Sequence, residues 1–220
     1  SQARGFRAAH KGANPSWDIV EAIPWPEPPT DLSTEVAKAK AARPDVIAPI
    51  TRPASALHLF PEIRKQGIDL MGIVGPGSPG LYEAGQLAAL KEDLEYVLTS
   101  VPWANFKNPR TTAVAADYRK RSGGKTFDTN SGYSYDAVFV IADILERATS
   151  LSDPDAIADA MKSTSFTGGL MQYSGPVAFN ELGDNANAVP TMIQILSQKP
   201  VAVWPKNAAL QPFVFPRPRA

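Results

Sequence analysis

The stretch "DVIAPITRPASALHLFPEIRKQGIDLMGIVGPGSPG" (residues 45–80) decides the fold of this chain. Two apolar runs, 45–50 and 68–74, flank a segment at 53–67 whose apolar residues recur at helical spacing. Runs that are apolar throughout are typical of strands buried on both faces of a parallel sheet. The stretch therefore predicts a strand, a helix and a second strand, and Pro61 is expected to kink or restart the helix.

The same alternation continues on both sides of this unit. Further helices are expected at 2–11, 31–44, 81–90, 110–122, 133–149 and 154–161, and further strands at 17–25 and 94–102. The helix at 133–149 carries an apolar stripe of Tyr135, Val138, Ala142, Leu145 and Ala148. The rest of the chain is irregular and β-like, and it ends in a proline-rich strap. This order predicts an α/β fold, a doubly wound parallel sheet with helices on both faces.

Composition narrows the class of protein. The 220 residues are 44% hydrophobic and carry 22 basic and 22 acidic side chains, so the net charge is zero. Nucleic-acid binders need a basic face, and this balance argues against one. The absence of cysteine excludes disulfides, thiolate nucleophiles and Cys-ligated metals. The sequence opens without Met and reads as a helix already under way, so we expect a piece of a longer protein.

A glycine-rich loop follows the second strand of the opening stretch. Gly75, Gly77 and Gly80 match the pattern G-x-G-x-x-G, which binds dinucleotides when its N–H groups face a pyrophosphate. Pro76 and Pro79 each remove one such donor. The acidic residues about 20 positions further on precede the next strand instead of ending it. We interpret the loop as a stiff rim at the carboxyl end of a strand, where open α/β sheets hold ligands.

Other chemical motifs are weak. His10 and His58 both lie on expected helices, and neither has a second ligand at metal spacing. The sequence contains no nucleophile elbow of the form G-x-S-x-G. No cofactor, metal or catalytic residue is predicted, and the chain is not expected to be an enzyme.

Read in order, the segments resemble the type I periplasmic solute-binding proteins, and within them the branched-chain amino-acid group of ABC-importer receptors. "DLSTEVAKAKAARPDVIAPI" is similar to the family's capped helix and following strand, and "ALHLFPEIRKQGIDLMGIVGPGSPG" to its next helix, strand and ligand-facing loop. "LEYVLTSVPWANFKNP" resembles the crossover between lobes. "YSYDAVFVIADILERA" and "SFTGGLMQYSGPVAFNELGDNAN" resemble the later helix and glycine-rich segment.

The resemblance implies a division into lobes. Residues 1–105 would form the α/β sandwich of the second lobe, 106–188 would return to the first lobe, and 189–220 would form a crossover and the C-terminal strap. The first lobe is then largely missing, and a signal peptide would lie upstream and direct the protein to the bacterial periplasm. The implied partners are the membrane permease of an ABC importer, and either the missing N-terminal lobe or another copy of this chain.

The resemblance also implies a ligand site between the lobes, at the loops after two strands. The matching residues are Thr51, Arg52 and Pro53 after the first strand, and Val74, Gly75, Pro76, Gly77 and Ser78 after the second. Tyr82, Trp103 and Tyr133 are possible ring partners for the ligand. Amino-acid-binding members tend to carry an acidic residue near the start of the second loop, and this sequence has none there.

Arg52 without an acidic neighbour suits a small aromatic or aliphatic carboxylate. Arg52 also has an interpretation without a role in binding, as a solvated loop residue or a partner of Glu62. An amino acid remains the alternative ligand, because the missing lobe would supply groups of its own. A ligand-sensing regulatory domain of the same fold and an α/β enzyme are the other functions left open.

Overall fold

The computed structural model describes residues 2–218 and separates the chain into two compact units. Unit 1 contains Ser1–Val101, Met192–Trp204 and Gln211–Ala220, and unit 2 contains Pro102–Thr191 and Pro205–Leu210. Among the described residues, no helix is both long enough and apolar enough to cross a membrane.

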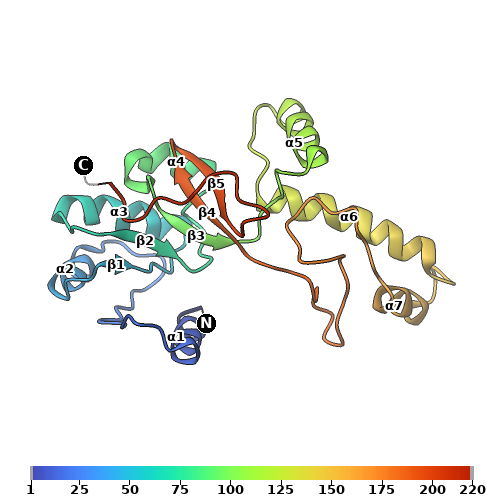
Figure 1. The fold of residues 1–220 in the computed structure, drawn as a ribbon, viewed down its shortest axis with the longest axis horizontal. Coiled ribbons are helices and arrows are strands. Elements are labelled where there is room, and N and C mark those ends of the chain that lie inside the picture. The colour runs from blue at the N-terminus through green and yellow to red at the C-terminus, as the bar shows by residue number, and fades with distance from the viewer. Residues whose placement is uncertain (1, 219–220) are drawn as a thin grey trace. The chain divides into compact units, whose positions relative to one another are not determined.

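Unit 1 is built on an open sheet with the strand order β1-β2-β3-β4-β5 (Figure 1). The strands are β1 (Val46–Ile47), β2 (Gly72–Gly75), β3 (Leu98–Val101), β4 (Thr191–Leu196) and β5 (Lys199–Trp204). The first three pair in parallel, whereas β4 and β5 form an antiparallel hairpin. The predicted α/β class is confirmed, with parallel pairing in the segment that the opening stretch encodes.

The helices of unit 1 are α1 (Gln2–Ala13), α2 (Ser33–Ala41), α3 (Pro53–Gln66), α4 (Ala84–Leu90) and the 3-10 turn η1 (Lys91–Leu94). Helix α3 contacts α2, α4 and η1. It begins at a proline, which needs no N–H partner in the first turn, and ends at Gly67 in the left-handed conformation (φ 62°). Pro61 lies inside α3, which continues as one helix. The bond it loses would join the carbonyl of Leu57, a residue exposed to water.

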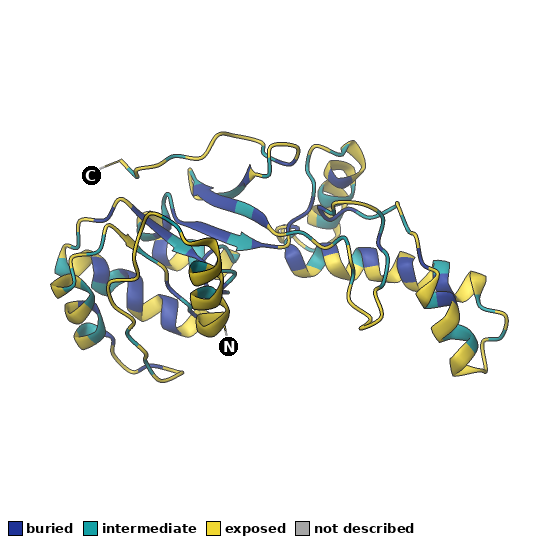
Figure 2. Ribbon diagram, turned by 60° about the horizontal axis from the view of Figure 1, so that its bottom comes forward, coloured by how far each residue is buried: buried dark blue, intermediate teal, exposed yellow. Residues whose placement is uncertain are grey.

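One core joins these helices to the sheet. Its buried members are Leu32, Val36, Ala56, Leu59, Phe60, Ile63, Leu70, Ile73, Leu81, Leu90, Leu94, Val97 and Ile195. Leu59, Phe60 and Ile63 recur at helical spacing, so α3 turns one face onto the sheet. Figure 2 shows this burial along the strands and the inner helix faces, whereas α1 has no buried residue.

The strand expected at 17–25 is absent from the structure. Trp17 and Val20 are exposed in this stretch, at 51% and 62% of their accessible surface. Prolines at 15, 24 and 26 surround it, and proline cannot donate to a strand ladder. The apolar residues at 19 and 23 followed a strand period, but Pro24 within the stretch lacks an N–H donor, and no strand forms there.

The C-terminal segment 211–218 runs along the sheet of unit 1. Gln194 on β4 is fully buried, and its side-chain amide makes two hydrogen bonds to the main chain of Val214. The amide nitrogen donates to the Val214 carbonyl at 2.9 Å, and the amide oxygen accepts from the Val214 N–H at 2.8 Å. The Arg217 N–H donates to the Met71 carbonyl at 2.7 Å. A β-carbon on Gly72 would lie 3.0 Å from the Phe215 ring, so glycine gives the segment room to pack there.

Unit 2 contains α5 (Pro109–Arg121), α6 (Thr129–Arg147) and α7 (Pro154–Lys162). Each begins at a residue whose side chain accepts a backbone N–H from the first turn, namely Asn108, Asp128 and Asp153. Isolated bridges, such as Ala104 with Met171 and Phe166 with Val177, pair the rest of this unit. The helices predicted here are confirmed to within a few residues.

The buried face of α6 is distinct from its apolar stripe. Gly132, Asp136, Val140 and Ile144 are buried and recur every four residues. Val138 and Leu145, two members of the apolar stripe, are 64% and 40% exposed. The glycine and the carboxylate belong to the buried face because they allow and bind the segment that packs there. Part of the apolar stripe of α6 is therefore left uncovered within unit 2.

Candidate functional site

Two loops meet at the carboxyl ends of β1 and β2, and we call the residues Thr51–Pro53 and Val74–Ser78 the strand-end rim. Because β1 and β2 are parallel neighbours, the segments that follow them leave the sheet at the same edge. The hydroxyl of Thr51 donates to the Pro79 carbonyl at 2.9 Å and so joins the two loops. A β-carbon on Gly80 would lie 2.9 Å from the Arg52 carbonyl. The structure thus brings these two predicted segments together within unit 1.

The glycines of the rim have packing roles. A β-carbon on Gly75 would overlap the Leu81 side chain, and one on Gly77 would lie 2.9 Å from the Ser100 carbonyl. Gly77 also has a φ of 80°, in the left-handed region that favours glycine. These residues let the loop turn closely over the end of β3.

The two hydroxyl side chains of the rim are buried. Thr51 is 2% exposed and its hydroxyl is bonded to Pro79, whereas Ser78 is 0% exposed and its oxygen has no partner among the described residues. We predicted that both hydroxyls face a ligand, which requires them to lie on the surface of the rim. Instead, the polar side chain that the rim presents to solvent is Arg52.

Arg52 immediately precedes α3. Its backbone N–H donates to the Ser55 hydroxyl at 2.7 Å, and that hydroxyl donates back to the Arg52 carbonyl at 3.0 Å. Glu62, the alternative partner, accepts bonds from Lys65 and Gln66 instead, and hydrogen bonds to those side chains lower the pKa of its carboxyl. Across residues 2–218, none of the ion pairs includes Arg52. The backbone of Arg52 is fixed by Ser55, and the residue is exposed.

The proposed aromatic partners belong to different parts of the chain. Tyr82 is half-buried against the core of unit 1. Trp103 is 4% exposed within unit 2, and Tyr133 lies on α6, also in unit 2, with 40% of its surface exposed. Burial, followed by the negative charge of Asp136, raises the pKa of the Tyr133 phenol.

Residues outside the predicted set also contact the rim. The side chain of Gln2 donates to the Gly77 carbonyl at 3.2 Å, and the Ser100 carbonyl lies close to Gly77. Ser100 could have been found from sequence, because it occupies the end of the third parallel strand. Nothing in the sequence pattern pointed to Gln2 as a residue that contacts the rim.

The turn after the rim is occupied by an acidic side chain of the protein itself. A carboxylate oxygen of Glu83 accepts the Gly80 N–H at 2.8 Å and the Tyr82 N–H at 3.3 Å. In a dinucleotide-binding loop, N–H groups at this position face a pyrophosphate. A phosphate here would have to displace Glu83 and would meet its charge.

We therefore expect no nucleotide to bind at residues 75–80. Calorimetric titration with NAD, FAD or ATP should give no heat beyond dilution. The Glu83→Gln variant should not create binding, because Pro76 and Pro79 still lack donors. Micromolar binding that is lost in a Gly77→Val variant, with folding retained, would contradict this interpretation.

No group of three or more His, Cys, Asp or Glu side chains that could hold a metal occurs among residues 2–218. In unit 2, the buried carboxylate of Asp136 accepts the N–H groups of Leu170 at 2.7 Å and Met171 at 3.1 Å, and the Tyr173 hydroxyl at 3.1 Å. Burial raises the pKa of the Tyr173 phenol, and the Asp136 charge and hydrogen bond raise it further.

Tyr173 should consequently stay neutral at a pH where an ordinary tyrosine ionises. In the unfolded chain the phenol of Tyr173 titrates near pH 10. The contribution of the neutral phenol to the free energy of unfolding is therefore complete below that pH, and it is lost as the pH rises through the higher pKa of the folded protein. Ultraviolet titration of tyrosinate, taken as the difference between the parent and Tyr173→Phe, measures this directly. A difference curve centred at about pH 10 would contradict the expectation.

The family model described as "Periplasmic binding protein" matches residues 1–195. The chain belongs to this family. No curated protein matches it.

Several solved structures share the fold. A leucine-binding protein from Thermotoga maritima is 20% identical, with a TM-score of 0.68 over 81% of this chain and 49% of its own. A solute-binding protein of an ABC transporter from R. palustris, solved with benzoate, is 15% identical, with a TM-score of 0.74 over 91% of this chain and 53% of its own. A leucine-, isoleucine-, valine-, threonine- and alanine-binding protein from Brucella ovis is 16% identical, with a TM-score of 0.67 over 94% of this chain and 55% of its own. This chain spans about half the length of these structures.

Proposed function

We propose that this chain is part of an extracytoplasmic solute-binding receptor of an ABC importer, and that the receptor binds a small organic acid. Membership of the periplasmic binding protein family supports the receptor role and the location. The observation that carries the ligand class is the exposed residue Arg52 on a rim whose residues include no acid. The acidic residue nearest along the chain after the second loop, Glu83, is bonded to backbone N–H groups.

An amino acid is the competing ligand. Two of the similar structures are described as binding amino acids, and one was solved with benzoate. An amino acid carries an ammonium group that needs an acceptor, whereas a simple carboxylate needs donors only. Arg52 supplies a planar pair of donors and no acceptor.

Native mass spectrometry of the full protein, followed by calorimetry with benzoate and with leucine, tests the ligand class. We expect a retained small acid, or tighter binding of benzoate than of leucine. Tighter binding of leucine, with heat that depends on its ammonium group, would replace the acid with an amino acid. Turnover of either compound would instead indicate an enzyme.

The exposed face of α6 has a proposed partner of its own. Val138, Phe139, Ile141 and Leu145 on this helix are all between 39% and 64% exposed. The solved relatives are about twice as long as this chain, so we assign this face to the part of their fold that residues 1–220 do not contain. That part would be the upstream half of the same polypeptide or a separate chain, and a second copy of residues 1–220 is the competing occupant.

We expect the double variant Val138→Asp/Ile141→Asp to stop this association while changing the stability of the chain itself by less than about 0.5 kcal/mol, because both side chains are exposed. Ala116→Asp, an exposed substitution on α5 of the same unit, is the matched control. Sedimentation velocity of the chain with and without the remaining half measures the result. Unchanged association in the double variant would exclude this face.

A further inference from the structure

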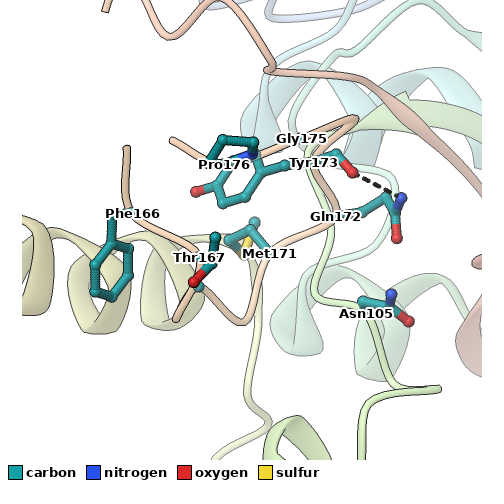
Figure 3. Close-up of a pocket in the computed structure, with 9 residues that line it drawn as sticks. Asn105, Phe166, Thr167, Met171, Gln172, Tyr173, Gly175 and Pro176 are labelled. Carbon is teal, nitrogen blue, oxygen red and sulfur yellow. Dashed lines mark hydrogen bonds between the residues drawn. The ribbon is translucent and has the colours of Figure 1, made fainter. Parts of the chain in front are cut away.

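Unit 2 contains a pocket of about 380 Å³ beside the segment that follows α7 (Figure 3). Its apolar walls are Phe166, Met171, Tyr173 and Pro176, and its polar edge includes Asn105 and Gln172. All of these residues belong to unit 2, so the pocket is separate from the strand-end rim of unit 1. Nothing in the proposed function uses it.

Gln172 places an unsatisfied acceptor at this pocket. The residue is 5% exposed, and its side-chain nitrogen donates to the Tyr173 carbonyl at 3.2 Å, which fixes the orientation of the amide. Its side-chain oxygen is buried and has no partner among the described residues. Figure 3 shows this oxygen turned toward the Asn105 side of the pocket. Leaving a buried acceptor unpaired is unfavourable, so a ligand that donates a hydrogen bond would be stabilised here.

The described lining of the pocket lacks the cationic side chain that an anion would need. Of the described residues that line it, none carries a carboxylate, ammonium, guanidinium or imidazole group. Behind it, the Asp136 carboxylate binds Tyr173, so the phenol proton is not available to an anionic ligand. The guanidinium of Arg110 is engaged elsewhere in unit 2, because it donates to the Gly168 carbonyl at 3.1 Å and lies over the Tyr135 and Phe139 rings.

Two glycines allow this wall to pack closely against its neighbours. A β-carbon on Gly169 would lie 2.9 Å from the Tyr173 ring and 3.0 Å from Asp136, and one on Gly132 would overlap the Met171 sulfur. The segment at 168–173 therefore lies directly against α6, and the Tyr173 ring is held by its hydroxyl. The wall is preorganised, which reduces the entropic cost of binding.

From these observations we propose that this pocket is a second ligand site, specific for a small neutral molecule with a planar apolar body and an N–H donor, of the carboxamide class. The amide N–H would donate to the Gln172 oxygen, and the apolar body would pack against Met171, Tyr173 and Pro176. This site differs in charge preference from the rim at Arg52. It does not depend on the function proposed for that rim.

Benzamide and benzoate form the matched pair of probes, because they share a ring and differ in donor and charge. We expect benzamide, titrated into the isotope-labelled chain, to shift the amide NMR signals of Gly169, Met171 and Gln172, with a dissociation constant on the order of 0.1–1 mM. Benzoate should not shift these signals. Gln172→Met keeps the size of the side chain without the acceptor and should weaken benzamide binding by roughly tenfold.

A second variant covers the case in which Gln172→Met fails to fold. Thr167 is an exposed lining residue, so Thr167→Phe should obstruct the pocket without disturbing the core, and Thr126→Phe, an exposed substitution elsewhere in unit 2, is its control. Loss of benzamide shifts in the first and their retention in the second supports the site. Absence of benzamide shifts at millimolar concentration, equal shifts with benzoate, or unchanged affinity in Thr167→Phe would overturn it. Carboxylate binding at Arg52 is measured separately, and neither result decides the other.

Discussion

Arg52→Ala is expected to weaken the binding of a small carboxylate by about 2–4 kcal/mol, or roughly thirty- to thousand-fold. A guanidinium that meets a carboxylate inside a partly dry cleft forms two charge-assisted hydrogen bonds in one plane. Removing it leaves the carboxylate desolvated without those donors. The backbone of Arg52 is held by Ser55, so its side chain starts from a fixed position.

Arg52→Lys should restore only part of this loss, because an ammonium group cannot reproduce the planar pair of donors. The matched control is Arg43→Ala, an exposed arginine of unit 1 outside the rim. Calorimetry with the acid that the protein retains measures all three, at unchanged melting temperature. If Arg52 is only a solvated loop residue, both of its variants will bind within about a factor of two of the parent. That result would also remove the preference for an acid ligand.

The parallel part of the fold could be predicted because local and tertiary signals agree there. Residues 45–80 place apolar runs, a proline at the start of a helix and a glycine at its end in the order that a strand–helix–strand unit requires. Residues 17–25 have an apolar alternation but lie among prolines, and no ladder forms. Pro24, which lies inside the stretch, was the signal against a strand that the apolar alternation outweighed in the prediction.

The candidate site was less predictable than the fold. Strand ends identified the two loops that meet at the rim, because parallel strands deliver their ends to one edge. The same rule could not distinguish a hydroxyl that faces solvent from one that is buried, as at Thr51 and Ser78. On α6, the hydrophobic stripe could not reveal that Asp136 is buried, because its burial depends on N–H groups 34 and 35 residues away.

Asp136→Ala is the substitution expected to damage unit 2 most. The carboxylate is 3% exposed and accepts bonds from the backbone of Leu170 and Met171 and from the Tyr173 hydroxyl. Removing it leaves two buried N–H groups and a phenol without their acceptor, which should cost about 3–5 kcal/mol of the free energy of unfolding. Because a whole domain is stable by only about 5–15 kcal/mol, this loss should open the segment at 168–173.

Two milder variants separate the carboxylate from its individual bonds. Asp136→Asn keeps the shape but turns an amide donor toward one of the donors it must bind, so its cost should be smaller, about 1–3 kcal/mol. Tyr173→Phe removes one bond and leaves both backbone N–H groups paired, at a cost of about 1 kcal/mol. Hydrogen exchange of the Leu170 and Met171 amides, together with urea unfolding, should rank the variants as Ala, then Asn, then Phe. Equal exchange rates in all three would show that Asp136 does not hold this segment against α6, because only that contact predicts a graded response at these two amides.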